Sequence, residues 1–267
     1  MTPDARFLGR NNPLLSRLRR IVKRQEAELT VVDGLNLVRE MLGLEIRFEE
    51  LYAVGPHIKE LIRLPGVRRL AQAGNLFEID PETATRIAPS QHGQGVLAVV
   101  RVPQHTFALA SSALFLDRVQ DPGNLGGIVR TAAAFGVRLI ICSPGCADPF
   151  SPRAIRASAG HTLRLPVLHS ATFSAAASAY KRAGGRVSGT VGAGGTPLHS
   201  WTPAPPLLLV LGNEGQGLSA EILDRCTDQV TVPMSSTVES LNVAVSAGII
   251  LATLWVRPEF RSGLDIP

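Results

Sequence analysis

Short apolar runs alternate with amphipathic segments along the first hundred residues. The apolar runs predict strands at 29–34, 50–55, 75–80 and 95–102. Apolar positions at helical spacing predict helices at 13–23, 35–44, 57–64 and 81–89. This alternation with short connections predicts a small α/β sandwich. None of its segments carries a constellation of residues typical of catalysis.

A second series of apolar runs begins after the stretch 103–111. Strands are predicted at 113–119, 137–142, 163–168, 185–191, 206–212 and 228–234. Helices are predicted at 128–136, 173–184 and 242–256, with a loop at 121–127 and Gly136 ending the first helix. Because these strands are strongly apolar and alternate with helices, they predict a parallel sheet that is buried on both faces.

The chain of 267 residues is therefore predicted to be an α/β protein with two domains. The predicted parts are a flexible N-terminus at 1–13, a first domain at 14–102, a linker at 103–111, a second domain at 112–258 and a tail at 259–267. No internal repeat and no low-complexity tract is apparent.

Composition narrows the class of protein. Hydrophobic residues make up 45% of the chain, which excludes disorder over most of its length. The longest apolar runs fall short of the ~20 residues that span a bilayer, and the N-terminus has no signal-peptide pattern, so we expect a cytoplasmic protein. The three cysteines, Cys142, Cys146 and Cys226, predict neither a disulfide framework nor a metal site.

Basic residues exceed acidic ones by 27 to 22, and the sequence pI is about 9.6. Almost all of the basic residues are arginines. Codon usage in a GC-rich genome would also explain this preference for arginine over lysine. Codon usage does not explain their clustering in residues 1–24, which carry one acid, Asp4. We therefore consider Arg17, Arg19 and Arg20 as RNA contacts, with a solvated charged helix as the alternative.

Three loops rich in Gly, Asn or hydroxyl groups follow predicted strands, and ligands of open α/β sheets bind at that edge. The first, 121–127, leads into a helix that carries Arg130 one turn from Gly126. The second, LGNEGQGLS at 211–219, is hard to explain as a plain turn. The third, 233–243, is polar and leads into the closing helix, where Ser240 or Asn242 fits an N-cap.

The segments NLGGIVRTAAAFG, LGNEGQGLS and VPMSSTVESLNVAVSAGI, in this order, resemble the three signature motifs of SpoU-type (TrmH-family, SPOUT superfamily) RNA ribose 2′-O-methyltransferases. The resemblance covers about 112–257. Residues 29–102 resemble the ribosomal-protein-like substrate-binding domain of members that modify rRNA. Asp33 stands where many members have Glu, and 193–206 follows no family pattern.

The resemblance implies a C-terminal SPOUT sheet with a trefoil knot and S-adenosyl-L-methionine as the cofactor. The apolar side chains of Leu211, Val232, Met234 and Leu241 would suit the adenine ring, and backbone groups of irregular loops would bind its edge. The positions that match the family's cofactor-binding residues are Thr190, Val191, Gly212, Asn213, Glu214, Val232, Met234 and Leu241.

The resemblance also implies catalytic residues. Arg130 matches the catalytic arginine, and three roles are open. It could bind the neighbouring phosphate and position the ribose, it could act as the base, or it could stabilise charge while the substrate phosphate takes the proton. A guanidinium pKa above about 12 disfavours the role of a base. Asn124 would orient Arg130 or bind the ribose. Glu214, Ser240 and Asn242 would complete the pocket, with Asn242 as a partner of Arg130 across a dimer.

We therefore expect a homodimeric enzyme that methylates a ribose 2′-hydroxyl of RNA, most plausibly ribosomal RNA, without a metal or a membrane partner. Arg156, in RASAGH at 156–161, is a further RNA-contact candidate, with a plain surface arginine as the alternative. A tRNA methyltransferase and an inactive RNA-binding member remain open. A Rossmann-type oxidoreductase is disfavoured because the chain lacks the G-x-G-x-x-G pattern.

Overall fold

The computed structural model describes residues 5–44, 46–90, 94–110 and 112–261, and it divides into two compact units. Unit 1 comprises the residues up to Pro103 together with Phe150–Gly160, and unit 2 comprises the rest. The sequence pattern assigns 150–160 to the second domain. The structure places this segment in unit 1, because its helix α7 (Pro152–Ala157) packs on a strand of that unit.

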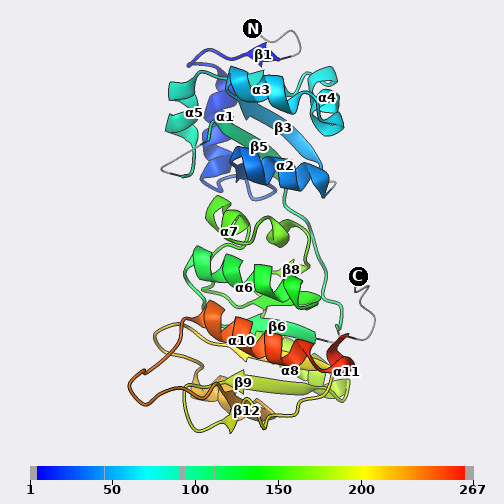
Figure 1. The fold of residues 1–267 in the computed structure, drawn as a ribbon, viewed down its shortest axis with the longest axis vertical. Helices are drawn as coiled ribbons and strands as arrows, with labels where there is room; N and C mark the ends of the chain where they lie inside the picture. The colour runs from blue at the N-terminus through cyan, green and yellow to red at the C-terminus, as the bar shows by residue number, and fades with distance from the viewer. Residues whose placement is uncertain (1–4, 45, 91–93, 111, 262–267) are drawn as a thin grey trace. The chain divides into compact units, whose positions relative to one another are not determined.

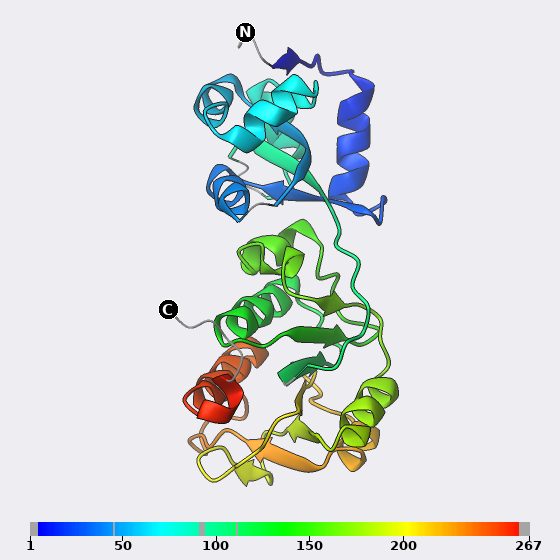
Figure 2. The ribbon, with the colours of Figure 1, turned by 90° about the vertical axis from the view of Figure 1, so that its right-hand side faces the viewer.

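Unit 1 is a five-stranded sheet with helices on both faces (Figures 1 and 2). In spatial order the strands are β1 (Arg6–Phe7), β4 (Leu76–Glu78), β3 (Phe48–Ala53), β5 (Val96–Arg101) and β2 (Leu29–Asp33). Strand β5 is antiparallel to both of its neighbours, and the other pairs are parallel. One face carries α1 (Pro13–Val22) and α5 (Pro81–Ile87), and the other carries α2 (Leu35–Gly43), α3 (Gly55–Leu61) and α4 (Pro65–Gln72).

The expectation of a flexible segment at 1–13 is wrong for its described part. Arg6 and Phe7 pair in parallel with β4, and Leu8 is fully buried in the core. Asn12 then caps α1, since its Oδ1 accepts a hydrogen bond from the amide of Leu14 at 3.0 Å. Apolar burial and strand pairing therefore fix a segment whose polar composition suggests a free end. Residues 1–4 lie outside the described part.

Unit 2 is a seven-stranded sheet, parallel throughout, as predicted. In spatial order its strands are β10 (Thr196–Pro197), β12 (Asp228–Thr231), β9 (Arg186–Thr190), β11 (Leu207–Leu211), β6 (Ser112–Leu116), β7 (Leu139–Cys142) and β8 (Val167–Leu168). The predicted strand 163–168 is only partly a strand, because His161–Leu163 forms a 3-10 turn.

Helices cover both faces of this sheet (Figure 2). Helices α8 (Phe173–Arg182) and α9 (Ala220–Asp224) pack on one face through a continuous apolar core with β6, β9 and β11. On the other face, α6 (Pro122–Ala134) lies beside α10 (Val243–Trp255), which is followed by α11 (Pro258–Arg261). In the described residues no helix combines the length and the apolar character that crossing a bilayer would need.

The loop predicted at 121–127 is wrong, because α6 already begins at Pro122. Asp121 accepts a hydrogen bond from the amide of Asn124 at 2.9 Å, and Pro122 occupies the first turn, where its missing N–H costs nothing. The Asp-Pro-Gly signal of a turn is thus the start of a helix. Gly136, predicted to end it, adopts a φ of +68° just beyond the last turn.

Candidate functional site

A cavity of about 400 Å³ opens at the carboxyl ends of β9, β11 and β12 in unit 2. Three loops line it: residues 190–192, 211–217 and 232–241. All eight residues predicted to bind the cofactor lie in its wall: Thr190, Val191, Gly212, Asn213, Glu214, Val232, Met234 and Leu241. The cavity therefore lies at the sheet edge at which parallel α/β proteins bind ligands.

The loop after β11 is a tight turn that is closed by its own amide groups. Asn213 and Gly217 exchange backbone hydrogen bonds, at 3.2 Å and 2.9 Å. The side chain of Asn213 accepts hydrogen bonds from the amides of Gly215 and Gln216, at 2.9 Å and 3.1 Å. At Gly212 a Cβ atom would lie 2.4 Å from the carbonyl carbon of Gly217, so this position has no room for any side chain.

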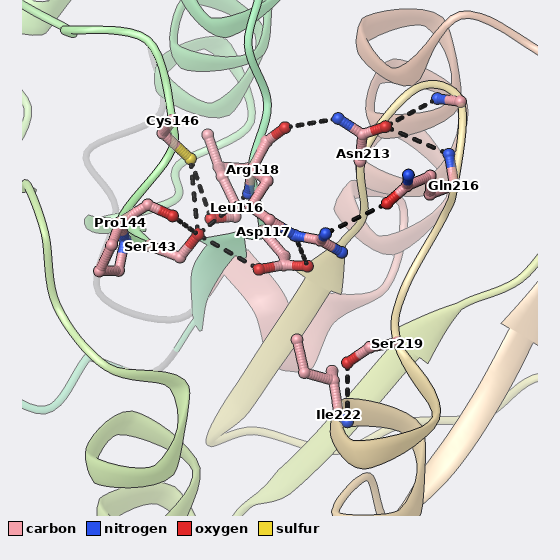
Figure 3. Close-up of polar contacts among 11 residues, drawn as sticks. Leu116, Asp117, Arg118, Ser143, Pro144, Cys146, Asn213, Gln216, Ser219 and Ile222 are labelled. Carbon is pink, nitrogen blue, oxygen red and sulfur yellow. Dashed lines mark hydrogen bonds and ion pairs between the residues drawn. The ribbon is translucent and has the colours of Figure 1, made fainter.

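A second turn, after β6, supports this loop from the side (Figure 3). The backbone carbonyl of Arg118 accepts a hydrogen bond from Asn213 Nδ2 at 2.8 Å, and the Arg118 guanidinium donates to Gln216 at 3.2 Å. Asp117 pairs with the same guanidinium at 3.1 Å, and the hydroxyl of Ser143 accepts from the Arg118 amide at 3.0 Å. Sequence reasoning missed Asp117 and Arg118, because they end an apolar run that predicts only a strand.

Cys146 lies beside this turn (Figure 3). Its Sγ donates a hydrogen bond to the carbonyl of Leu116 at 3.2 Å and lies 3.9 Å from the hydroxyl of Ser143. A hydrogen bond with Cys142, followed by backbone hydrogen bonds, lowers the pKa of Cys146 to about 7. The same contact, together with complete burial, raises the pKa of Cys142 well above its usual range. The two cysteines thus differ sharply in acidity.

Three of the predicted catalytic residues form a chain of side-chain hydrogen bonds. Asn124 donates from Nδ2 to Glu214 Oε1 at 2.9 Å, and it accepts at Oδ1 from Asn242 Nδ2 at 2.9 Å. Asn242 also caps α10, since its Oδ1 accepts from the amide of Ala244 at 2.8 Å. The first turn of α6, the loop after β11 and the start of α10 are therefore joined through side chains next to Glu214, which lines the cavity.

Arg130 lies on the exposed side of α6, in its second half, and it is absent from the lining of the cavity. In the described part of the chain, no side chain pairs with its guanidinium. Ser240 is exposed and lines the cavity. The predicted pairing of Asn242 with Arg130 across a dimer is not tested by one chain, but within this chain Asn242 already bonds Asn124.

The four arginines predicted to contact RNA lie in unit 1, and three of them form ion pairs. Arg17 pairs with Glu50 and Glu26, Arg20 with Glu26 at 3.1 Å, and Arg156 with Asp33 at 2.6 Å. Arg19 has no such partner in the part of unit 1 that the structure describes. The basic cluster is therefore partly neutralised by acids of its own unit. Across the described residues no three His, Cys, Asp or Glu side chains are grouped to hold a metal.

Comparison with known proteins identifies the class. An rRNA methyltransferase from Sinorhizobium meliloti has the same fold, with a TM-score of 0.79 and 26% identity over 98% of this chain and 100% of that chain. A structure of this relative with bound AdoMet matches with a TM-score of 0.77. The fold is therefore that of RNA methyltransferases.

Sequence comparison leads from this class to the family. A protein of Synechocystis sp. that is named an uncharacterized tRNA/rRNA methyltransferase is 32% identical over 94% of each chain. The 23S rRNA (guanosine(2553)-2′-O)-methyltransferase RlmP of Bacillus subtilis is 29% identical over 86% of this chain and 89% of its own. The profile of the SpoU rRNA Methylase family matches residues 111–252. The chain belongs to this family, which confirms the predicted resemblance.

Proposed function

We propose that this protein transfers a methyl group from S-adenosyl-L-methionine to a ribose 2′-hydroxyl of ribosomal RNA. One observation carries the proposal: three loops distant in sequence line one cavity, and Glu214 in its wall belongs to a hydrogen-bonded chain with Asn124 and Asn242. The relative from B. subtilis, whose substrate is a ribose in 23S rRNA, supports the choice of RNA.

The cavity fits the proposed cofactor. Its volume of about 400 Å³ lies within the range of small-molecule sites, and irregular backbone from 211–217 and 232–241 offers N–H and C=O groups at its wall. Leu211, Val232 and Leu241 supply apolar surface for a flat heterocycle. When bound, S-adenosyl-L-methionine supplies a methyl group on a positively charged sulfur, which is already activated for transfer.

The residues of this chain then have separate tasks. Arg130, without an ion-pair partner in the described residues, is available to bind a neighbouring RNA phosphate. That phosphate would take the proton of the 2′-hydroxyl while the guanidinium stabilises the charge of the oxygen. We favour this role over that of a base, because a guanidinium does not lose its proton readily. Asn124 orients the ribose, and it is held for this task by Glu214 and Asn242. Ser240 lies in the cavity wall and lines the ribose side of the pocket.

Two further expectations belong to this proposal. The C-terminal segment is expected to form a trefoil knot, as the family resemblance implies. Residues 232–242, which lead from β12 past the cavity to α10 beside α6, are the segment concerned. A homodimer is expected through α10, on which Val245 and Ile249 are 50% and 37% exposed. The cytoplasm is the expected compartment, since ribosomal RNA is found there.

Two alternatives make different predictions. A tRNA ribose methyltransferase would modify tRNA in place of rRNA, and the name of the Synechocystis relative includes both substrates. An inactive RNA-binding member would bind RNA without transferring a methyl group, but the bonded Asn124, Glu214 and Asn242 would then have no task.

The deciding experiment is a map of ribose methylation across rRNA and tRNA after incubation with the purified protein and S-adenosyl-L-methionine. One new 2′-O-methyl site in rRNA is the expected result. A new site in tRNA would establish the first alternative. Calorimetric binding of the cofactor without any methylation would favour the second, and no binding at millimolar cofactor would refute the proposal as a whole.

A further inference from the structure

A second cavity, of about 220 Å³, lies in unit 1, and none of the residues assigned to methyl transfer lines it. It opens at the junction of β2 with α2, and helix α7 contributes one side of it. The lining residues are Asp33, Gly34, Asn36, Leu37, Ser90, Gln94 and Arg156. Its size is below that of a typical site for a drug-sized molecule and suits a single ring system.

The wall of this cavity contains a buried carboxylate that is only half satisfied. The Asp33 side chain is 2% exposed. Its Oδ2 accepts hydrogen bonds from the Ser90 hydroxyl and from Arg156, both at 2.6 Å. Its Oδ1 is buried and accepts no hydrogen bond in the described structure. Buried polar atoms are nearly always paired. Asp33 lines the cavity, so its orphaned oxygen points to a ligand there that donates an N–H or O–H group.

Two other residues that line this cavity carry donor groups. Gln94 Oε1 accepts from the Leu35 amide at 2.9 Å, which fixes the orientation of the amide and leaves Nε2 as a donor. Arg156 uses one nitrogen on Asp33, and its side chain is otherwise 44% exposed, so further N–H groups remain. Leu37 adds an apolar wall. A fitting ligand is therefore a small ring with a donor for Asp33 and a carbonyl for Gln94 or Arg156.

We propose that this cavity binds one unpaired RNA base that has both an amino group and a ring carbonyl, which means guanine or cytosine. Adenine lacks the carbonyl. Uracil lacks the amino group, and its one Watson–Crick donor, N3–H, lies between two carbonyl oxygens that the Asp33 carboxylate would repel. The amino group would donate to Asp33 Oδ1, and the carbonyl would accept from Gln94 or Arg156. Unstacked bases with accessible Watson–Crick edges are the usual targets of sequence-specific RNA recognition. The inference rests on the proposed function only in taking RNA as the ligand.

The test measures binding of the full chain to short single-stranded oligouridylates by fluorescence anisotropy, without S-adenosyl-L-methionine. Each oligonucleotide carries one central guanine, cytosine, adenine or uracil. We expect guanine, cytosine or both to bind at least about fivefold more tightly than uracil and adenine, the lower end for one good base contact. A difference between the guanine and cytosine probes identifies the base. Equal binding of all four oligonucleotides would overturn the inference.

Variants then assign the preference to the cavity. D33N removes the carboxylate and is expected to abolish the preference for the amino-bearing base. If Asp33 acted only through its negative charge, D33N would instead strengthen the binding of all four oligonucleotides equally. Leu37→Phe narrows the cavity without touching the carboxylate, and it decides the question if D33N does not fold. Glu40→Gln, which removes one exposed charge from the same helix, is the control and keeps the preference.

A preference that survives in both cavity variants would place base recognition elsewhere and overturn the inference. The assay needs no methyl transfer, so its failure is distinguishable from failure of the proposed function. Methylation of rRNA with no base preference in binding would leave the proposed function intact and remove only the base pocket.

Discussion

Asn124 and Glu214 lie ninety positions apart in the chain, yet the amide of one donates to the carboxylate of the other at 2.9 Å. This bond joins the first turn of α6 to the loop that follows β11. Because Asn242 donates to the same Asn124, the three loops of the site are linked through one side chain. A substitution that displaces one of these loops is therefore expected to displace the other two through Asn124.

The first prediction concerns Arg130. Replacement by Ala should lower the rate of methyl transfer by at least about 100-fold, because the charge that stabilises the developing oxyanion is lost. The affinity for S-adenosyl-L-methionine should stay within about twofold, since Arg130 does not line the cavity. Arg130→Lys should recover only part of the rate, because an ammonium lacks the two-pronged hydrogen-bonding geometry.

Single-turnover kinetics and calorimetry check this prediction. Arg182→Ala, at an exposed position near the end of α8, is the matched control and should behave as the wild type. Full activity of Arg130→Ala would exclude Arg130 from the mechanism.

The second prediction compares two glycines of the loop after β11. Gly212→Ala should weaken binding of S-adenosyl-L-methionine about tenfold or more, because its Cβ would lie 2.4 Å from the backbone of Gly217 and the loop must open. Gly212→Val should be worse still. At Gly215 a Cβ would meet only Asn213 Oδ1, at 3.6 Å, so Gly215→Ala should keep the affinity. Equal calorimetric affinities for Gly212→Ala and Gly215→Ala would contradict this view of the loop.

The third prediction concerns the basic helix α1. Deleting residues 1–24 is not a clean test, because Leu15, Leu18 and Ile21 are buried in unit 1. The double replacement of Arg19 and Arg20 by Gln keeps the core. It should weaken RNA binding at low salt and reduce the slope of log affinity against log salt by roughly 0.7 to 0.9 for each lost phosphate contact.

Affinity measured over a series of salt concentrations gives this slope. The double replacement of Arg63 and Arg69 by Gln, which removes the same charge from exposed positions of unit 1, should keep the wild-type slope. An unchanged slope in the Arg19 and Arg20 variant would make α1 a solvated surface helix.

The fourth prediction follows from the acidity of the cysteines. A pKa of about 7 for Cys146 means that its reactive thiolate grows as the pH rises through 7. Burial raises the pKa of Cys226 to about 11, so at pH 8 it remains a thiol. Iodoacetamide at pH 8 should therefore modify Cys146 before Cys226. The rate of Cys146 modification at pH 7 should be about half of its rate at pH 8. Peptide mass spectrometry identifies the site, and modification of Cys226 first would show that the order of acidities is wrong.

Much of unit 2 was predictable because its strands are uninterrupted apolar runs, such as Leu207–Leu211, which only a sheet buried on both faces explains. The beginning of α6 was not predictable, because the sequence Asp121-Pro122-Gly123 is as typical of a turn as of a capped helix start. Helix α4 was missed for a similar reason, since Pro65-Gly66 has the composition of a turn. The local sequence does not decide between a turn and a helix at these positions. The packing of the helix against the rest of its unit decides it.

The sequence motifs predict which loops line the cavity, but they do not predict the hydrogen bonds between those loops. The motif resemblance brings Asn124, Glu214 and Asn242 to one pocket, but it assigns Asn242 to Arg130, whereas the described chain bonds it to Asn124. The orphaned oxygen of Asp33 has no signal in the sequence at all, because it depends on where Ser90 and Arg156 are placed by distant elements.

Helix α7 gives unit 1 an unusual dependence on the rest of the polypeptide. It is encoded between two strands of unit 2, yet Thr30 donates to the carbonyl of Phe150 at 2.6 Å, and Asp33 relies on Arg156 for its charge partner. A fragment that stops at Pro103 would leave β2 uncovered and Asp33 without its only cationic partner in the described structure. The N-terminal unit is thus no detachable module: grafting it onto another enzyme of this family would require transplanting 150–160 as well.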